Sequence, residues 1–138
     1  MPESIHVPAL TVLVVEDEYL IREGIVSYLE EAGCVVIEAE TGERAIEICK
    51  SNVPVDVLFT DIQLPGAASG FDVAETFRAS HSDMPIMYVS GYAGGRERCV
   101  PDSLFFQKPY QATAILKACR EFGKLRRQQS TSSALAAG

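Results

Sequence analysis

The sequence predicts an α/β fold, a doubly wound sheet of five parallel strands with helices on both faces. Short, almost continuous apolar runs recur along the chain, which is the pattern of strands covered on both faces of a parallel sheet. Segments with apolar residues at helical spacing separate these runs, and this alternation implies parallel neighbours joined by right-handed crossovers. The chain has 138 residues, 47% of them hydrophobic, which suits one domain with its own core.

Each expected strand is a mostly apolar run that stops at a polar or turn-forming residue. The expected strands are residues 10–15, 34–37, 55–59, 86–89 and 104–107. The third run, apolar apart from Asp56, is typical of a central strand, and Pro65-Gly66 forces a turn soon after it. We therefore expect Asp61 at the carboxyl end of a central strand, the edge where open α/β sheets bind ligands.

Each expected helix carries apolar residues three or four positions apart. The expected helices are approximately residues 18–32, 41–51, 71–80 and 111–126. Gly33 is suited to end the first helix, and Thr41 can cap the second, which Pro54 closes. Residues 92–102 contain two adjacent glycines and a proline, so we expect at most a short, marginal helix there.

Charge and hydropathy exclude two classes of partner. A net charge of −7 and a pI near 4.8 argue against nucleic-acid binding, which needs a basic patch. The one basic cluster, Lys124, Arg126 and Arg127, is expected to complement the dipole of the last helix. No apolar run approaches the roughly 18–20 residues of a membrane helix, and no secretory signal is visible. We expect a soluble cytoplasmic protein with neither a membrane nor a nucleic-acid partner.

The expected domain covers residues 10–127, between an arm (1–9) and a disordered tail (128–138) rich in Ser, Ala, Gln and Thr. The cysteines lack zinc-site spacing and should stay reduced in a cytoplasm. They are Cys34, Cys49, Cys99 and Cys119. All except Cys99 fall in apolar patterns and are expected to be core residues.

Polar residues gather at the predicted strand ends. They are Glu16 and Asp17 after the first strand, Asp61 after the third, Ser90 after the fourth and Lys108 after the fifth. Because the carboxyl ends of parallel strands share one edge, these side chains can converge. Clustered carboxylates repel one another unless a cation joins them, and one lysine cannot neutralise three. A hard divalent cation such as Mg²⁺ is the natural counter-charge.

Such a cluster suits phosphoryl chemistry. Mg²⁺, a lysine and a hydroxyl can together stabilise phosphoryl oxygens, and a carboxylate can attack phosphorus to form an aspartyl phosphate. Asp61, between the acids and the Ser–Lys pair, is the best nucleophile candidate. Simpler readings remain for the others: an acidic first turn of a helix for residues 16–18, a turn or cap for Ser90 and an exposed loop lysine for Lys108.

Four segments in order carry a family resemblance: Val14 to Glu18, Thr60 to Gly66, Ser90 to Tyr92 and Gln107 to Tyr110. Across about Thr11 to Arg126 the chain resembles a two-component response-regulator receiver domain. The resemblance implies the flavodoxin-like receiver fold with strand order 2-1-3-4-5. It also implies that Asp61 is the phosphoacceptor, that Ser90 and Lys108 contact the phosphoryl group, and that the Lys108-Pro109 bond is cis. The implied Mg²⁺ ligands are Glu16, Asp17, Asp61 and the backbone carbonyl of Gln63.

The resemblance further implies a phosphoacceptor rather than an enzyme. Its partner would be a histidine kinase or histidine phosphotransfer protein, and it would be a monomer or a weak phosphorylation-dependent dimer. Three features depart from the commonest pattern. The loop at residues 66–70 is one residue longer, Tyr88 to Tyr92 is similar to a stand-alone subgroup with Phe-Ala-Thr-Gly-Tyr, and Phe105 replaces the usual switch tyrosine and so lacks its hydroxyl.

Three alternatives stay open. The chain could be the receiver portion of a hybrid histidine kinase. A Mg²⁺-dependent phosphohydrolase with an Asp nucleophile usually needs a second acid two residues later, where this chain has Gln63. A flavodoxin-like binding module needs a Ser-, Thr- or Gly-rich loop after the first strand, where this chain is acidic.

Overall fold

A computed structural model describes residues 9–92 and 94–123, which contain one parallel sheet in the order β2-β1-β3-β4-β5. Its strands are β1 (Thr11–Val15), β2 (Val35–Ala39), β3 (Val57–Asp61), β4 (Ile86–Ser90) and β5 (Leu104–Gln107). The register pairs Asp61 with Val89 and Ser90 with Gln107, so the carboxyl ends of the central strands meet at one edge. The predicted fold class and strand order are confirmed.

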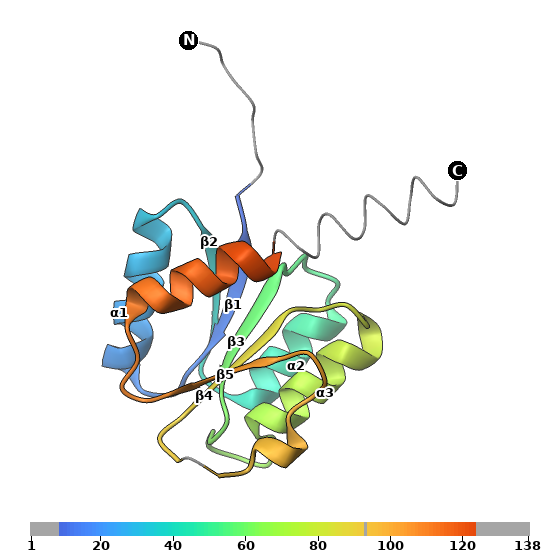
Figure 1. The fold of residues 1–138 in the computed structure, drawn as a ribbon. Coiled ribbons are helices and arrows are strands. Elements are labelled where there is room, and N and C mark those ends of the chain that lie inside the picture. Colours follow the sequence, from blue (N-terminus) through green and yellow to red (C-terminus); the bar gives the residue numbers. More distant parts are fainter. Residues whose placement is uncertain (1–8, 93, 124–138) are drawn as a thin grey trace, which may run out of the picture.

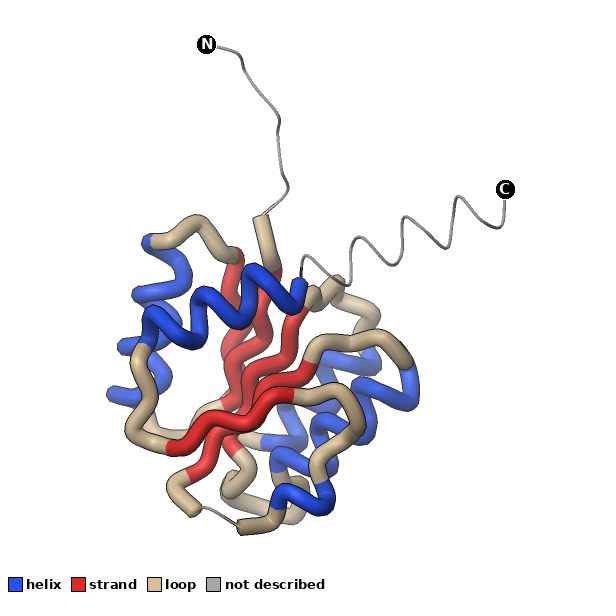
Figure 2. The backbone as a smooth tube through the Cα atoms, viewed as in Figure 1, coloured by secondary structure: helices blue, strands red, loops and turns tan. Residues whose placement is uncertain are grey.

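Helices cover both faces of the sheet. They are α1 (Tyr19–Glu31), α2 (Gly42–Lys50), α3 (Gly70–Ser80) and a last helix whose described part is residues 112–123. Figure 1 shows α1 and the last helix together on one face and α2 and α3 on the other, and the tube in Figure 2 shows the strands between the two layers. All four predicted helices are present.

The two faces have separate apolar cores because successive strand residues point to opposite sides. Leu13 and Leu58 pack with buried residues of α2 and α3. Their neighbours Val12 and Val57 pack with buried residues of α1 and the last helix. All five residues of β3 are buried, which confirms that the run ending at Asp61 is a central strand.

Helix ends follow local chemistry. Thr41 caps α2 as predicted, its Oγ1 accepting the Arg44 N–H at 3.0 Å. Gly33 follows α1 with a φ of 96°, in the left-handed region that glycine adopts at low cost. The structure also has a capping box at the start of α3, which we did not predict from the sequence. The Asp72 N–H donates to Ser69 Oγ at 3.3 Å and the Ser69 N–H donates to Asp72 Oδ2 at 2.8 Å.

Between β4 and β5 the described residues form one short 3₁₀ turn, Arg96–Arg98, as the glycines predicted. This turn lies against β5, because the Arg96 guanidinium stacks 4.2 Å from the centre of the Phe105 ring. Phe105 is half-buried at the margin of the core. Its role as a switch stays a prediction.

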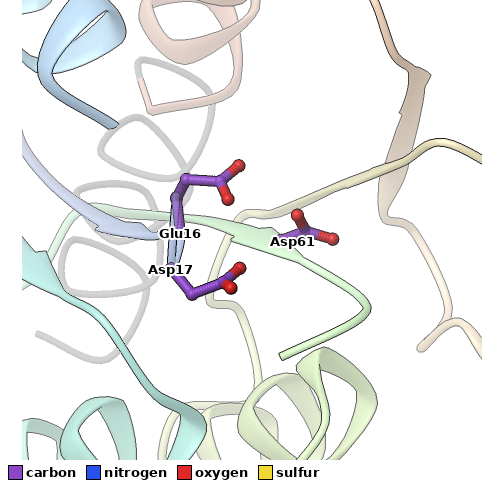
Figure 3. A group of neighbouring side chains, drawn as sticks. All are labelled: Glu16, Asp17 and Asp61. Atoms are coloured by element: carbon purple, nitrogen blue, oxygen red, sulfur yellow. The ribbon is translucent and has the colours of Figure 1, made fainter. Parts of the chain in front are cut away.

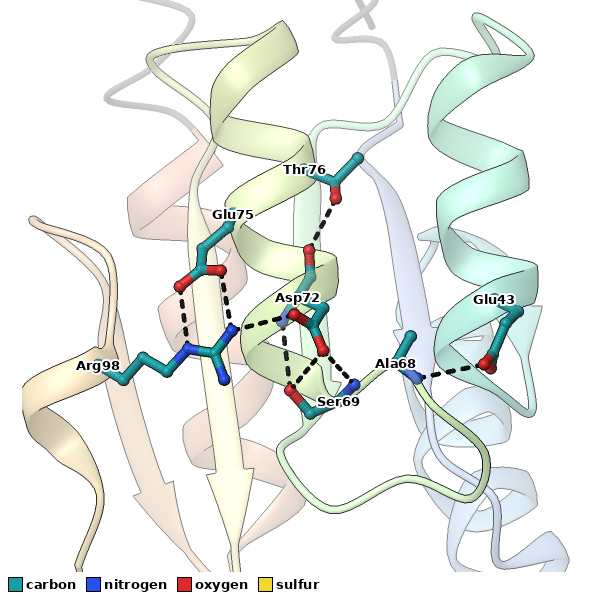
Figure 4. A network of polar contacts seen from close by, with 7 residues as sticks. All are labelled: Glu43, Ala68, Ser69, Asp72, Glu75, Thr76 and Arg98. Carbon is teal, nitrogen blue, oxygen red and sulfur yellow. Dashed lines mark hydrogen bonds and ion pairs between the residues drawn. The ribbon is translucent and has the colours of Figure 1, made fainter.

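Two arginines join the segment between β4 and β5 to α3. Arg98 forms ion pairs with Asp72 and Glu75, each at 3.0 Å, and Figure 4 shows its guanidinium between the two carboxylates. In the opposite direction, Arg78 of α3 donates to the Pro101 carbonyl at 2.6 Å. The segment that follows Ser90 is therefore fastened to α3 at two points.

All four cysteines are free, and Cys34, Cys49 and Cys119 are buried as predicted, whereas Cys99 is half-buried. Burial raises the pKa of the Cys119 thiol to about 12, so it stays protonated at neutral pH. Within residues 9–92 and 94–123, no helix has both the length and the apolar character needed to span a bilayer.

Several predictions concern parts of the chain that the structure leaves undescribed. The arm apart from Ala9, the tail (128–138) and the basic cluster of Lys124, Arg126 and Arg127 all lie outside the described residues. The domain bounds of 10–127 therefore stay a prediction.

Candidate functional site

The carboxyl edge of the sheet brings three of the predicted acids together. Glu16 follows β1 and is 3% exposed, Asp61 ends β3 and is 5% exposed, and Asp17 is exposed to solvent. One carboxylate oxygen of each lies within 4.8 Å of the others. Figure 3 shows the three side chains at the neighbouring ends of β1 and β3. Residues 16–18 are not the first turn of a helix, since α1 begins at Tyr19 with Glu18 as its N-cap.

Lys108 closes this acidic cluster. Its Nζ donates to Asp61 Oδ2 at 2.6 Å and to Glu16 Oε1 at 2.9 Å. Burial alone would lower the pKa of Lys108, but the hydrogen bonds and charges of Asp61 and Glu16 raise it above its usual value. The ammonium is thus charged at any physiological pH. The Lys108-Pro109 bond is cis, as the resemblance implied.

The two buried carboxylates differ in their surroundings. Burial raises the pKa of Glu16, and the opposing hydrogen bonds from Lys108 and from the Glu18 N–H at 3.1 Å do not fully offset it. Asp61 is held on both sides, because its Oδ1 accepts the Gln63 N–H at 3.0 Å while Oδ2 accepts Lys108. The carboxylate of Asp61 therefore has one fixed orientation at the sheet edge.

The acidic cluster fits a hard cation. Three carboxylate oxygens meet there, and oxygen ligands are those that Mg²⁺ prefers. Lys108 balances only part of the charge of Glu16, Asp17 and Asp61. Gln63 lies two residues beyond the end of β3, and its N–H donates to Asp61, so its backbone is beside the cluster.

Ser90 ends the neighbouring strand β4 and is 2% exposed. Its Oγ accepts the Tyr92 N–H at 3.0 Å, which is the turn role that the simpler reading gave it. Its carbonyl accepts the Lys108 N–H at 2.9 Å, so the ends of β4 and β5 are bonded together. Tyr92 itself is 63% exposed.

An open pocket of about 360 Å³ lies beside Lys108 and is lined by Ile21, Pro109 and Tyr110. The Tyr110 ring packs edge-on against Phe59, with the ring centres 5.6 Å apart. Burial raises the pKa of Tyr110 to about 12, so its hydroxyl is neutral. A mainly apolar surface therefore adjoins the charged cluster.

Arg22 is a site residue that the sequence reading missed. A charged residue in a helix is usually exposed, yet Arg22 is only 7% exposed. Its guanidinium donates to the Glu16 carbonyl at 2.8 Å and to Glu38 Oε1 at 3.0 Å. The available signal was its position three residues before the buried Ile25, which places both on one helix face. Arg22 fixes the backbone from which Glu16 projects.

Replacing Arg22 by methionine should lower the free energy of unfolding by about 2 kcal/mol, because the buried Glu16 carbonyl loses its donor. Urea unfolding measures this loss. Arg44→Met is the matched control, since Arg44 pairs with Glu47 on an exposed surface and its loss should fall within about 0.5 kcal/mol of zero. Equal stability of the two variants would contradict a role for Arg22 at this edge.

Comparison with known proteins assigns the family. The sequence profile of the response regulator receiver domain matches residues 12–120. A crystal structure of a response regulator receiver protein from Sinorhizobium medicae superposes with a TM-score of 0.82 at 32% identity, covering 86% of this chain and 97% of that one.

Two curated relatives are much longer. A cyclic di-GMP phosphodiesterase of Thermotoga maritima is 40% identical over 83 residues, 60% of this chain and 22% of that protein. The autoinducer 1 sensor kinase/phosphatase LuxN of Vibrio campbellii is 32% identical over 108 residues, 76% of this chain and 12% of that protein. The chain thus spans less than a quarter of either relative. With the profile match, the doubly wound sheet and the acidic edge in agreement, the chain belongs to the response regulator receiver domain family of two-component signalling systems.

Proposed function

We propose that Asp61 accepts a phosphoryl group from a phosphohistidine of a histidine kinase or histidine phosphotransfer protein, and that the chain then signals by contact with other proteins. The observation that carries this proposal is the bridge made by Lys108 between Asp61 and Glu16 at the carboxyl edge of the sheet. It joins the candidate acceptor Asp61 to Glu16, one of the candidate metal ligands, through a fixed cation.

Glu16, Asp17, Asp61 and the backbone carbonyl of Gln63 are the proposed Mg²⁺ ligands. The closeness of the three carboxylate oxygens supports this set. When bound, Mg²⁺ supplies positive charge against the carboxylates and the phosphoryl oxygens.

The chain's own residues prepare Asp61 for attack. The Gln63 N–H and the Lys108 ammonium each hold one oxygen of its carboxylate. One of these oxygens forms a bond to phosphorus while the bond from phosphorus to the donor's imidazole nitrogen breaks, and the electron pair leaves with that nitrogen. Lys108 then pairs with the phosphoryl oxygens. Ser90 Oγ accepts one hydrogen bond, so its own O–H is left to donate to the same group.

We propose a phosphoacceptor rather than an enzyme. Position 63, where phosphohydrolases with an Asp nucleophile usually carry a second acid, is a glutamine. The similarity to a sensor kinase supports a second candidate function, in which this chain is the receiver portion of a hybrid kinase. The proposal includes a cytoplasmic location and a monomer or weak phosphorylation-dependent dimer. It also includes no nucleic-acid partner, which the net charge of −7 supports.

Intact-mass spectrometry tests the acceptor. With phosphoramidate and Mg²⁺ the wild-type chain should gain one phosphoryl group, and with EDTA it should gain none. Asp61→Asn should gain none in either condition. Asp83→Asn, which changes an exposed acid before β4, should behave as wild type. Uptake that persists in Asp61→Asn, or no uptake by folded wild type, would overturn the proposal.

A further inference from the structure

The β3–α3 loop (residues 62–69) leads directly from Asp61 to the start of α3. Near its beginning, the Gln63 N–H holds Asp61 Oδ1 at 3.0 Å. Its ends are tied together, because the Gly70 N–H donates to the Ile62 carbonyl at 2.8 Å. The conformation of this loop therefore sets the orientation of the Asp61 carboxylate and the position of the Gln63 backbone.

A carboxylate from another element holds the outer half of this loop. Glu43, in the first turn of α2, accepts the Ala67 N–H at 3.0 Å and the Ala68 N–H at 3.2 Å, both at Oε2. Figure 4 shows the Glu43 side chain reaching from α2 to Ala68, just before Ser69 caps α3. Successive N–H groups beside a left-handed residue form a concave anion site, and Gly66 has a φ of 89°. In this chain the anion is Glu43.

Two glycines let the loop and α2 approach closely enough for this contact. A Cβ at Gly66 would lie 3.0 Å from Glu43 Oε2, and one at Gly42 would lie 2.5 Å from the Ala68 carbonyl oxygen. The loop backbone thus lies directly against the start of α2. Hydrogen bonds from three backbone N–H groups lower the pKa of Glu43. The largest effect comes from its own N–H, followed by those of Ala68 and Ala67, and the carboxylate is therefore ionised at neutral pH.

We infer that Glu43 is a positioning residue for the phosphoacceptor site. By fixing Ala67 and Ala68 it holds the β3–α3 loop, and through the loop it positions the Gln63 backbone, whose N–H donates to Asp61 and whose carbonyl would be a ligand of the metal ion. The inference rests on the proposed function, in which the Gln63 carbonyl is a Mg²⁺ ligand. Residues that orient metal ligands typically contribute about 10- to 100-fold to the affinity for the metal ion. Because Glu43 is exposed, we expect its contribution at the lower end of this range.

The test measures Mg²⁺ affinity and the Mg²⁺ dependence of phosphorylation. Glu43→Ala should weaken Mg²⁺ binding by about 10-fold in an NMR titration with the metal ion alone. Glu43→Ala should also raise the Mg²⁺ concentration needed for half-maximal phosphorylation by phosphoramidate. This fold-change should be larger than the fold-decrease in the phosphorylation rate at saturating Mg²⁺. Glu43→Gln should lie closer to wild type, because an amide oxygen can still accept both N–H groups.

Glu47→Ala is the matched control. It removes the same charge from α2, but Glu47 pairs with the exposed Arg44. It should leave Mg²⁺ affinity unchanged, and amide exchange at Ala67 and Ala68 should quicken only in Glu43→Ala.

The outcomes separate the two proposals. If wild type is phosphorylated and Glu43→Ala binds Mg²⁺ as wild type does, the positioning role is wrong and the proposed function stands. A merely structural role would lower stability and quicken exchange without changing Mg²⁺ affinity, and would also overturn the inference. If wild type binds Mg²⁺ without taking up a phosphoryl group, the proposed function fails, while the comparison of Mg²⁺ affinities still decides the role of Glu43. Wild type that binds no Mg²⁺ would overturn both.

Discussion

Replacing Lys108 by methionine should lower the free energy of unfolding of the metal-free protein by about 3 kcal/mol. Methionine keeps much of the aliphatic packing but removes the ammonium between Glu16 and Asp61. These carboxylates are 3% and 5% exposed, so water cannot replace the lost cation well. Removing one partner of a buried ion pair typically costs about 3–5 kcal/mol, and the Lys108 side chain is 20% exposed, which places the loss at the lower end.

Urea unfolding in EDTA and in Mg²⁺ measures this effect. Mg²⁺ should stabilise Lys108→Met more than wild type, because the metal ion supplies the charge that the variant lacks. Lys117→Met is the control, since Lys117 is exposed on the last helix and its loss should change stability by no more than about 0.5 kcal/mol. A Lys108→Met protein as stable as wild type in EDTA would show that the bridge contributes nothing to the fold.

Replacing Gly70 by alanine should destabilise the protein by about 3 kcal/mol. Gly70 is the first residue of α3 and packs on the backbone that carries the acceptor. A Cβ there would overlap the Asp61 carbonyl oxygen and lie 2.7 Å from the Ile62 Cα. Both obstacles are backbone atoms at the end of the central strand and cannot rotate away. Either α3 or the carboxyl end of β3 must move, and overpacking of this kind costs about 1–3 kcal/mol or more.

The matched control is Gly24→Ala on α1. A Cβ at Gly24 would meet nothing within 4 Å, and the residue is exposed in the helix interior. Alanine there should stabilise the protein by about 0.5–1 kcal/mol, because it restricts the unfolded chain. The same substitution is therefore expected to act with opposite signs at the two sites, as measured by thermal or urea unfolding. If Gly70→Ala lowers the free energy of unfolding by less than about 1 kcal/mol, α3 is free to shift on β3.

The sequence by itself determined the elements and the edge at which the site lies. The apolar run before Asp61 predicted a strand buried on both faces, and every residue of β3 is buried. Strand ends predicted the meeting of Glu16, Asp61 and Lys108, because parallel strands bring their carboxyl ends to one edge, and the ion pairs confirm it. The strand order came from the family resemblance, since hydrophobic periodicity identifies strands without identifying their neighbours.

Only the tertiary structure decided how polar groups pair around that edge. Arg22 of α1 donates to Glu38 of β2, the next element in the chain. Glu43 of α2 accepts from the N–H of Ala67, 24 residues further along the chain. Hydrophobic periodicity records which face of an element is buried. The partner of a polar side chain depends on strand register and on the path of a loop. The hydrogen-bond partners of the buried arginine and of the carboxylate that holds the β3–α3 loop therefore follow from how the layers pack. Helical spacing places Arg22 on the face of Ile25, but it does not identify the groups to which Arg22 donates.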